Sequence, residues 1–434
     1  MKSSVKRKSP HAPAIALFED AYVHELAPLS LLRPSFDIKT GVFTLREKIE
    51  RQFGVKISQT YIRGYLDPRR EMDVDLDADA ADNFDSPTLF INGRVLCDKA
   101  FVRACKSLAL NTALVSQDQV LAMYLDAETA AQHEDYLREQ LIDVEYSPDL
   151  GLIPCNARII RHPWDVIRYH DEELKNDVQT LFSKKTPVSQ PACTGVTTLK
   201  KSNIRIGKNT RIYPSVVLNA EQGEIVIGND CAIYPYAYIE GPCFIGDHVI
   251  VKPHASIRNA SIGMQSRVAG EVHSTLFHSF VNKQHEGFAG HSYFAPWVNI
   301  GAGTITSNLK NNYGTITQPI GRTPPKKAQK KIDTGMQFLG TIAGDHVKFG
   351  INTMLNTGTI VGVCCNIFGG DYPPKNIPSF QWGGAQGFET FDIDKMVALA
   401  RLTMARRNEV FSPSDERVLR TVYDHAVGAR AAAV

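Results

Sequence analysis

Aliphatic side chains recur every six residues through the middle of this 434-residue chain. This period fits neither an amphipathic helix nor a half-buried strand. It is the period of a hexapeptide-repeat β-helix, in which each short strand sends one aliphatic side chain into a stacked core. Three runs keep the spacing: Ile227, Ile233, Ile239, Ile245, Val251 and Ile257; Ala343, Phe349, Leu355, Val361 and Ile367; and Phe288, Phe294 and Ile300. We therefore predict a left-handed parallel β-helix over residues 201–372 and favour it over a β-sandwich with coincidental spacing.

Two segments interrupt this repeat. Residues 270–287 are irregular, and residues 311–334 are polar and too long to form a simple turn. In a solenoid, insertions become loops on one face, and that face is often the binding face. We therefore expect functional residues near these two interruptions.

The segments before and after the repeat predict a separate N-terminal domain and two C-terminal helices. Residues 14–182 alternate short apolar strands with helical stretches, which is typical of an α/β domain of the Rossmann type. A basic tail, residues 1–13, precedes this domain, and a Ser/Thr/Pro-rich linker, residues 183–200, follows it. Residues 373–434 begin with a Pro/Gly-rich exit and continue into two C-terminal helices, the second N-capped by Ser412.

The composition argues against a nucleic-acid-binding, membrane-bound or disulfide-rich protein. Hydrophobic residues make up 43% of the chain and charged residues 22%, as in an ordinary globular protein. A net charge of +2 provides no overall field for nucleic acid or a membrane surface. Neither a membrane-spanning apolar run nor a signal-peptide core is expected. The eight cysteines have no C-x-x-C spacing, so we expect reduced thiols in the cytoplasm rather than a disulfide framework.

The run N-I-G-A-G-T-I-T-S-N, residues 299–308, resembles the acetyltransferase half of the bifunctional N-acetylglucosamine-1-phosphate uridyltransferase and glucosamine-1-phosphate N-acetyltransferase family. In that family a histidine lies fourteen residues before the first Asn of the run, which here is His285. The resemblance implies that His285 is the general base of acetyl transfer, because an imidazole can accept a proton from the attacking amine near neutral pH. It further implies that Phe288 and Asn308 contact substrate. His291 is the rival candidate for the base and is also predicted to bind substrate.

The sequence departs from this family at the cation expected to bind the sugar phosphate. The family's lysine aligns with His273, so another residue must supply the charge. A phosphate ester mainly needs compensating cations and hydrogen-bond donors. Lys283 and Lys310 are preferred for their closeness in sequence to His285 and Asn308. The other candidates are Lys252, in a Lys-Pro pair resembling the family's Arg-Pro but off by about half a repeat, and Arg258.

The N-terminal part resembles the start of sugar-phosphate nucleotidyltransferases. The stretch P-L-S-L-L-R-P, residues 28–34, leads into a helix beginning L-R-E-K-I-E at residues 45–50. The glycine-rich loop that normally cradles nucleotide phosphates is replaced by an acidic stretch, residues 18–26. The family's metal-binding Gly-Asp pair is replaced by Gly93 followed by arginine.

The same resemblance names candidate residues in this part. Arg33, Lys48, Asn92 and Gly93 are the candidates for nucleotide binding, and Asp98 is the candidate ligand for Mg²⁺. Arg33 and Lys48 could equally be ordinary surface charges. Nucleotidyl transfer is therefore less well supported than acetyl transfer.

We accordingly predict a transferase of amino-sugar nucleotide synthesis. The β-helix would transfer acetyl from acetyl-CoA to glucosamine-1-phosphate, and the N-terminal domain would bind, and could uridylylate, the product with UTP and Mg²⁺. The resemblance implies a homotrimer with active sites between subunits, and no nucleic-acid or membrane partner. Three alternatives stay open: a nucleotidyltransferase with the β-helix as trimerisation scaffold, a non-catalytic assembly that senses sugar nucleotides, and a zinc hydratase on the same β-helix.

Overall fold

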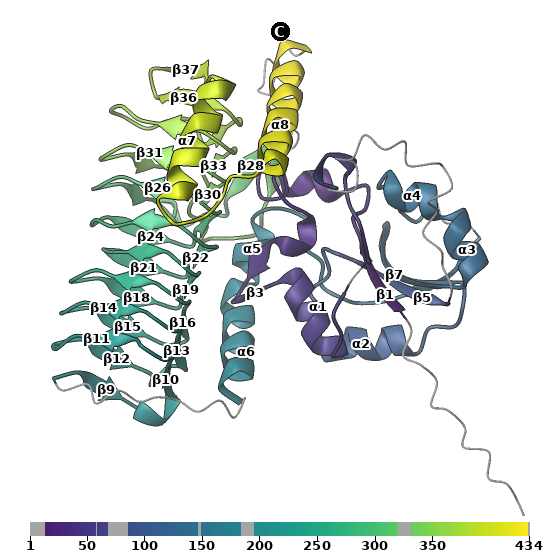
Figure 1. The fold of residues 1–434 in the computed structure, drawn as a ribbon, viewed down its shortest axis with the longest axis horizontal. Helices are drawn as coiled ribbons and strands as arrows, with labels where there is room; N and C mark the ends of the chain where they lie inside the picture. Colours follow the sequence, from purple (N-terminus) through teal and green to yellow (C-terminus); the bar gives the residue numbers. More distant parts are fainter. Residues whose placement is uncertain are drawn as a thin grey trace, which may run out of the picture. The chain divides into compact units, whose positions relative to one another are not determined.

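The fold is seen in a computed structural model that describes residues 14–57, 59–67, 86–145, 149–183, 195–319 and 331–432 (Figure 1). Their contacts form two compact units. The first unit comprises residues 14–23 and 45–159, and the second comprises residues 24–44 and 160–432. The predicted basic tail and most of the predicted linker lie outside the described residues. No helix in the described ranges is long and apolar enough to cross a membrane.

The first unit is an α/β layer around a mixed six-stranded sheet, which confirms the predicted α/β class. The strand order is β4 (Gln59–Tyr61), β1 (Ala14–Phe18), β5 (Thr88–Asn92), β7 (Gln119–Leu125), β6 (Thr112–Ser116) and β8 (Gly151–Pro154). Strand β1 pairs in parallel with β4 and β5, whereas β7 pairs antiparallel with β5 and β6. The helices are α1 (Leu45–Phe53), α2 (Lys99–Lys106), α3 (Ala127–Gln132) and α4 (Glu134–Arg138).

The second unit is a parallel β-solenoid with three sheets, as the period of six predicts. The first sheet contains β10 (Ile204–Ile206), β13 (Ile225–Ile227), β16 (Cys243–Ile245), β19 (Ser261–Ile262), β22 (Leu276–Phe277), β25 (Tyr293–Phe294), β30 (Ile342–Ala343), β33 (Ile360–Val361) and β35 (Asn376–Ile377). The second contains β11 (Arg211–Ile212), β14 (Ala232–Ile233), β17 (Ile250–Val251), β20 (Arg267–Val268), β23 (Asn282–Lys283), β26 (Asn299–Ile300), β31 (Lys348–Phe349), β34 (Asn366–Ile367) and β36 (Gln381–Gly384), closed by antiparallel β37 (Gly387–Thr390).

The third sheet completes each coil. It contains β9 (Thr197–Leu199), β12 (Val217–Asn219), β15 (Tyr238–Glu240), β18 (Ser256–Arg258), β21 (Glu271–His273) and β24 (Phe288–Gly290). Beyond it, β27 (Ile305–Thr306) pairs with β32 (Met354–Leu355). We call the turn from the second to the third sheet the second corner, and the turn from the third sheet back to the first sheet the third corner.

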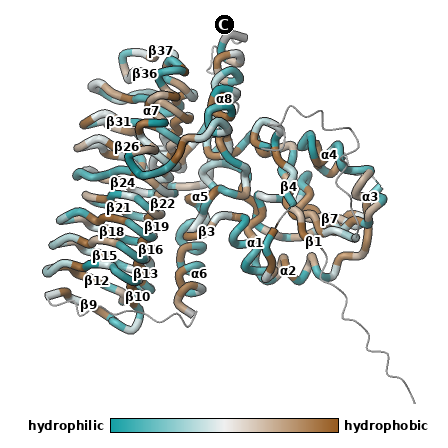
Figure 2. Tube along the Cα trace, in the orientation of Figure 1, coloured by the Kyte–Doolittle hydropathy of each residue, from teal (hydrophilic) through white to brown (hydrophobic). Residues whose placement is uncertain are grey.

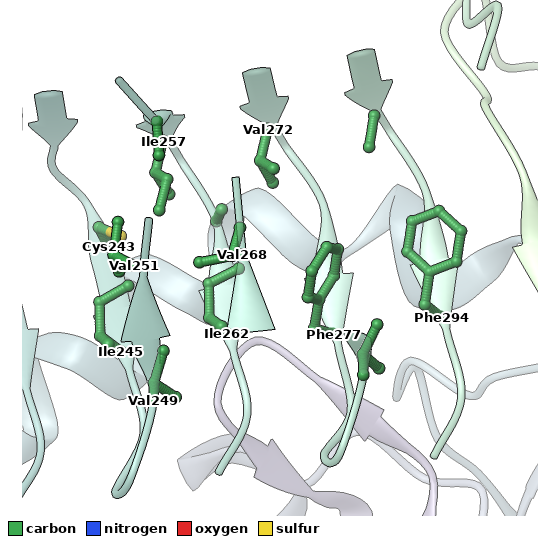
Figure 3. Packing of buried hydrophobic residues seen from close by; sticks show 14 of the residues in the cluster. Cys243, Ile245, Val249, Val251, Ile257, Ile262, Val268, Val272, Phe277 and Phe294 are labelled. Atoms are coloured by element: carbon green, nitrogen blue, oxygen red, sulfur yellow. The ribbon is translucent and has the colours of Figure 1, made fainter. Parts of the chain in front are cut away.

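The predicted repeat residues form the solenoid core, with one correction: Phe288 is half-buried and faces away from the core, because Ala289 takes the inward position of β24. Ile233 pairs with Val251 and Ile239 with Ile257, and all four side chains are fully buried. Figure 3 shows such side chains following one another from coil to coil, and Figure 2 shows hydrophobic and hydrophilic residues alternating along the coils. Each apolar column therefore excludes water while parallel hydrogen bonds join the coils.

The two predicted interruptions have different outcomes. Residues 270–287 do not break the stack, because β21, β22 and β23 pair in register with the coils on both sides. These coils are only shorter, since Ser261 pairs with Leu276 whereas Ile225 pairs with Cys243. The second interruption is a true insertion, with the antiparallel hairpin β28 (Thr317–Pro319) and β29 (Lys331–Asp333).

Segments outside the repeat pack against the solenoid within the second unit. Residues 24–44 contain β2 (Lys39–Thr40) and β3 (Phe43–Thr44), and α5 (Asp165–Arg168) precedes α6 (His170–Ser183). Leu174 and Val178 of α6 form a small core that includes Val42 and Phe43 and touches Phe244 of the first sheet. Parts of the predicted domain 14–182 thus belong to the compact unit that holds the solenoid.

The two predicted C-terminal helices are present. They are α7 (Ile393–Ala405) and α8 (Pro413–Ala432). The Asp392 carboxylate accepts a hydrogen bond from the Lys395 N–H at 2.9 Å, and the Ser412 hydroxyl accepts from the Asp415 N–H at 3.1 Å. Both helices therefore begin at side-chain caps, as the sequence predicts for Ser412.

Truncating one core residue tests the stacked column. We expect Ile257→Ala to lower the free energy of unfolding by about 2–5 kcal/mol, because it leaves a cavity between fully buried neighbours. Met264→Ala is the matched control, since Met264 is 44% exposed, and it should change stability by about 0.5 kcal/mol or less. Urea unfolding measures both, and equal losses would contradict the assigned core.

Candidate functional site

The second corner brings two of the predicted site residues together. Lys252 follows β17 and His285 follows β23, two coils further on, and both line one polar cavity of about 170 Å³. The His285 side chain is exposed and that of Lys252 is half-buried. The full lining is Lys252, Pro253, His254, Ala269, Gly270, Gln284, His285 and Glu286. The separation of Lys252 and His285 in the sequence is off by about half a repeat from the family's spacing. Both residues still reach this cavity, because the coils between them differ in length.

Stacked aromatic rings support this corner from the preceding coils. The Tyr213 and Tyr234 rings stack at 4.8 Å, and the Lys252 Nζ lies 5.7 Å from the centre of the Tyr234 ring. Tyr236 and His254 stack at 4.9 Å. The Lys252 ammonium is thus held over an aromatic face at the edge of the cavity, a contact that limits its motion without neutralising its charge.

Lys283, a predicted phosphate contact, lies beneath this corner and is only 1% exposed. Its Nζ donates to the carbonyl of Ala269 at 3.0 Å and to that of His285 at 2.9 Å. Burial lowers the pKa of Lys283 to about 8. Gly270, at φ +70°, leaves the room this requires, because a Cβ there would lie 2.9 Å from Nζ. Lys283 therefore anchors the backbone that carries His285.

The third corner holds a different predicted pair. The Asn308 Nδ2 donates to the His291 Nδ1 at 2.9 Å, so the structure places Asn308 against His291, the rival base. Phe288 lies beside them, because a Cβ at Gly290 would come within 2.4 Å of the Phe288 Cζ and 2.7 Å of the Asn308 Nδ2. His285 and His291 flank the three-residue strand β24 from opposite ends.

His273 completes this corner, although the sequence predicts it to be structural. Its ring packs edge-on against the ring of His291 at 5.5 Å. Burial and the nearby Arg258 lower the pKa of His273, while Asp171 opposes the shift. The alignment of His273 with the family's phosphate-binding lysine could have identified it as a residue of the candidate site. Arg258, predicted to bind substrate, donates to Glu271 at 3.1 Å on the same sheet.

Lys310, the last predicted cation, begins the insertion after Asn308. Its Nζ donates to the carbonyl of Thr315, and Thr315 in turn donates its hydroxyl to Asp333 at 2.7 Å. These bonds close the base of the hairpin. Lys310 therefore has a structural partner, and the preference for it over Lys252 finds no support in the cavity lining.

In the α/β unit, acidic residues follow β1 where the phosphate loop is missing. Glu19 accepts from the Arg63 Nε and N–H, each at 3.0 Å. Asp20 accepts from the Arg94 Nε at 3.0 Å and from the Asn92 Nδ2 at 2.7 Å, and all of these side chains are largely buried. Arginines thus neutralise the carboxylates internally, an arrangement the sequence did not predict.

The other predicted nucleotide and metal residues are dispersed. Arg33 belongs to the unit with the solenoid and forms a buried ion pair with Asp345. Lys48 is buried in α1, and the Gly93 N–H donates to Phe18 at 2.9 Å. Asp98 caps α2 by accepting from the Phe101 N–H at 2.8 Å. Across the described ranges, no three His, Cys, Asp or Glu side chains group in a way that could hold a metal ion.

Family models match both parts of the chain. Residues 15–186 match a model described as sugar nucleotidyl transferase, and residues 224–259 match the bacterial transferase hexapeptide model of six repeats. The chain is therefore similar to sugar nucleotidyltransferases over its N-terminal part and to hexapeptide-repeat transferases over part of the solenoid. This confirms the resemblance expected from residues 28–34 and 299–308.

The related proteins are bifunctional transferases. The bifunctional protein GlmU of Synechococcus elongatus is 27% identical over 323 residues, covering 66% of this chain and 64% of its own. The bifunctional sugar-1-phosphate nucleotidylyltransferase/acetyltransferase of Sulfurisphaera tokodaii is 29% identical over 152 residues, 34% of this chain and 36% of its own. The chain thus spans less than two thirds of these relatives. A solved UDP-N-acetylglucosamine acyltransferase from Arabidopsis aligns at 16% identity over 51% of this chain and 80% of its own, with a TM-score of 0.25.

Removing one partner of the buried Arg94–Asp20 ion pair tests whether the arginines stabilise the carboxylates that follow β1. Arg94→Met should destabilise the α/β unit by about 3–5 kcal/mol, because the Asp20 carboxylate, only 1% exposed, loses its compensating charge. The double variant Asp20→Asn with Arg94→Met removes both charges and should recover most of that loss. Thermal or urea unfolding measures the difference, and an unstable double variant would show that packing of Arg94 dominates.

The buried Lys283 predicts a pH dependence of stability. The pKa of Lys283 is about 8 in the folded chain, below its ordinary value of 10.5, so the unfolded chain binds more protons between these pH values. Stability should therefore rise by about 2 kcal/mol from pH 8 to pH 10, relative to Lys283→Met. The control Lys208→Met replaces an exposed lysine and should keep the wild-type slope. Identical slopes for wild type and Lys283→Met would refute this assignment.

Proposed function

We propose that the solenoid transfers an acetyl group from acetyl-CoA to the amine of glucosamine-1-phosphate, with His285 as the general base. One observation carries this proposal. His285, which the family resemblance implies as the base, and Lys252, one of the candidate cations for the phosphate, line the same cavity. A base and a cation at one opening are what an amino-sugar phosphate requires.

The chemistry follows from the two side chains. The substrate amine attacks the thioester carbonyl, the carbon–sulfur bond breaks, and the CoA thiolate leaves. His285 takes the proton that the amine loses and returns it to the thiolate, so that acetamide and thiol are the products. The Lys252 ammonium compensates the phosphate charge. The exposed position of the His285 imidazole permits approach of both substrates, and Lys283 holds its backbone from below.

The assembly is part of the same proposal. A cavity of about 170 Å³ is smaller than the usual range of about 300–1,000 Å³ for a small-molecule site. A neighbouring copy of the chain in a homotrimer would supply the remaining wall. Acetyl-CoA and the sugar phosphate would then bind between subunits.

Nucleotidyl transfer by the α/β unit is the second candidate, favoured by the family match over residues 15–186. UTP would be its nucleotide and Mg²⁺ its metal. The residues present do not fit Mg²⁺ well, because Glu19 and Asp20 are bound to arginines and Asp98 caps a helix. Pyrophosphate release from UTP and N-acetylglucosamine-1-phosphate tests this activity. Binding of the sugar nucleotide without release would favour a sensing role for this unit.

The first experiment follows CoA thiol release from acetyl-CoA and glucosamine-1-phosphate. We expect His285→Gln to lower kcat by about 10²–10⁴-fold, the usual contribution of a general base. His248→Gln is the matched control, because His248 is an exposed histidine in a left-handed turn whose equivalent in the next coil is Gln265. It should keep wild-type activity.

Three outcomes would contradict the proposal. Unchanged release by His285→Gln would remove the proton-transfer role from the second corner. Absence of release by the wild-type chain with any amino-sugar phosphate would leave the scaffold or the sensor as the better description. A stoichiometric zinc in the purified chain would instead favour a hydratase.

A further inference from the structure

The hydrogen bond between Asn308 and His291 determines which imidazole nitrogen carries the proton. The amide nitrogen of Asn308 can only donate, so the His291 Nδ1 must accept. A neutral imidazole has one protonated nitrogen, and here that nitrogen is Nε2. His291 is therefore arranged as a hydrogen-bond donor at Nε2, whereas a general base needs a free nitrogen lone pair.

The ring of His291 is held in place from several sides. The Phe338 ring packs nearly parallel to it at 5.0 Å, and the His273 ring packs edge-on at 5.5 Å. The His291 N–H donates to the carbonyl of His273 at 2.9 Å, and its own carbonyl accepts from Gly340 at 2.8 Å. Within the described part of the chain, Nε2 has no hydrogen-bond partner, so its N–H is available to a ligand.

The surroundings keep this ring neutral. Burial, and secondarily the neighbouring His273, lower the pKa of His291 to about 4. One cation, Arg258, adds to the effect of burial on the pKa of His273, and three carboxylates oppose it: those of Asp171, Glu271 and Glu240. At neutral pH His291 thus offers an N–H without a positive charge. Such a donor suits a hydroxyl or carbonyl oxygen, whereas a phosphate would be bound more strongly by a cation.

Phe288 provides a surface next to this donor. Because residue 290 is glycine, the Phe288 ring lies over the strand and close to the Asn308 amide. The ring is half-buried, on the side of β24 that faces away from the core, where Ala289 points inward. An aromatic face of this kind suits the C–H face of a sugar ring, and the polar groups at its edge suit the ring's hydroxyls.

We propose that His291 binds the acceptor sugar by donating its Nε2–H to a neutral hydroxyl or carbonyl oxygen, while the sugar ring lies on Phe288. Asn308 is a positioning residue that holds the imidazole in the donor tautomer. This inference rests on the proposed acetyl transfer for the identity of the sugar. It assigns His291 to recognition and leaves proton transfer to His285.

Kinetics with a matched pair of variants separates recognition from proton transfer. In His291→Leu the donor is lost, so KM for glucosamine-1-phosphate should rise about tenfold while kcat stays within a factor of three. In His291→Gln the amide nitrogen can replace Nε2, and KM should return to within about threefold of wild type. A loss of kcat by 10² or more in both variants, as expected for a base, would overturn the inference.

Nuclear magnetic resonance of the ¹⁵N-labelled histidine side chains tests the tautomer without relying on activity. We expect His291 to show a protonated Nε2, an unprotonated Nδ1 and no titration between pH 5.5 and pH 8. In Asn308→Asp the carboxylate must accept from Nδ1–H, so the protonated nitrogen should change and the pKa of His291 should rise. A protonated Nδ1 in the wild-type chain would overturn the inference.

Calorimetric binding of glucosamine-1-phosphate distinguishes this inference from the proposed reaction. If no thiol is released but the sugar phosphate binds and His291→Leu weakens that binding about tenfold, acetyl transfer fails and the recognition role stands. If thiol is released and neither KM nor binding responds to His291→Leu, the recognition role fails and acetyl transfer stands. Absence of binding by the wild-type chain overturns both.

Discussion

Parallel backbone pairing between successive coils is the constraint on which the solenoid depends. Each inner strand is hydrogen-bonded to the coils on both sides, as in the pairing of Ile239 with both Leu218 and Ile257. The short strands and their buried side chains must therefore stay in register. The corners carry no such requirement, so they can differ in length, bear an insertion or present polar side chains. Both proposed sites lie at the corners for that reason.

The same constraint explains how much could be predicted from sequence. Ile245 and Val251 reveal the fold because most inward positions are apolar, Lys283 being an exception, and the period of six persists through most of the coils. The joint placement of Lys252 and His285 could not be read from spacing, because coils of unequal length separate them. The pairing of Asn308 with His291 depends on a contact between coils and on the missing side chain of Gly290, neither of which leaves a periodic signal.

The α/β unit shows a different limit to prediction from the sequence. The acids after β1 are visible in sequence, and alone they suggest repulsion of phosphates or a bound metal. Their partners Arg63 and Arg94 follow two other strands, and only the sheet order brings them to the same edge. Internal neutralisation of Glu19 and Asp20 is therefore a tertiary property. A sheet similar to that of sugar nucleotidyltransferases can thus use the charges at its edge for stability, so the fold alone does not establish the activity.

The roles proposed for the two histidines around β24 would place two different tasks at the ends of one short strand. A proton acceptor must remain accessible to the attacking amine, and His285 lies exposed beside a cation and a carboxylate. A fixed donor must instead be held in place and partnered on one nitrogen, and the half-buried His291 meets both conditions. Because β24 is paired to β21 along its length, it holds the two imidazoles apart on one rigid element. Recognition of the sugar at one corner would therefore set the position of the amine at the other, without either histidine having to move.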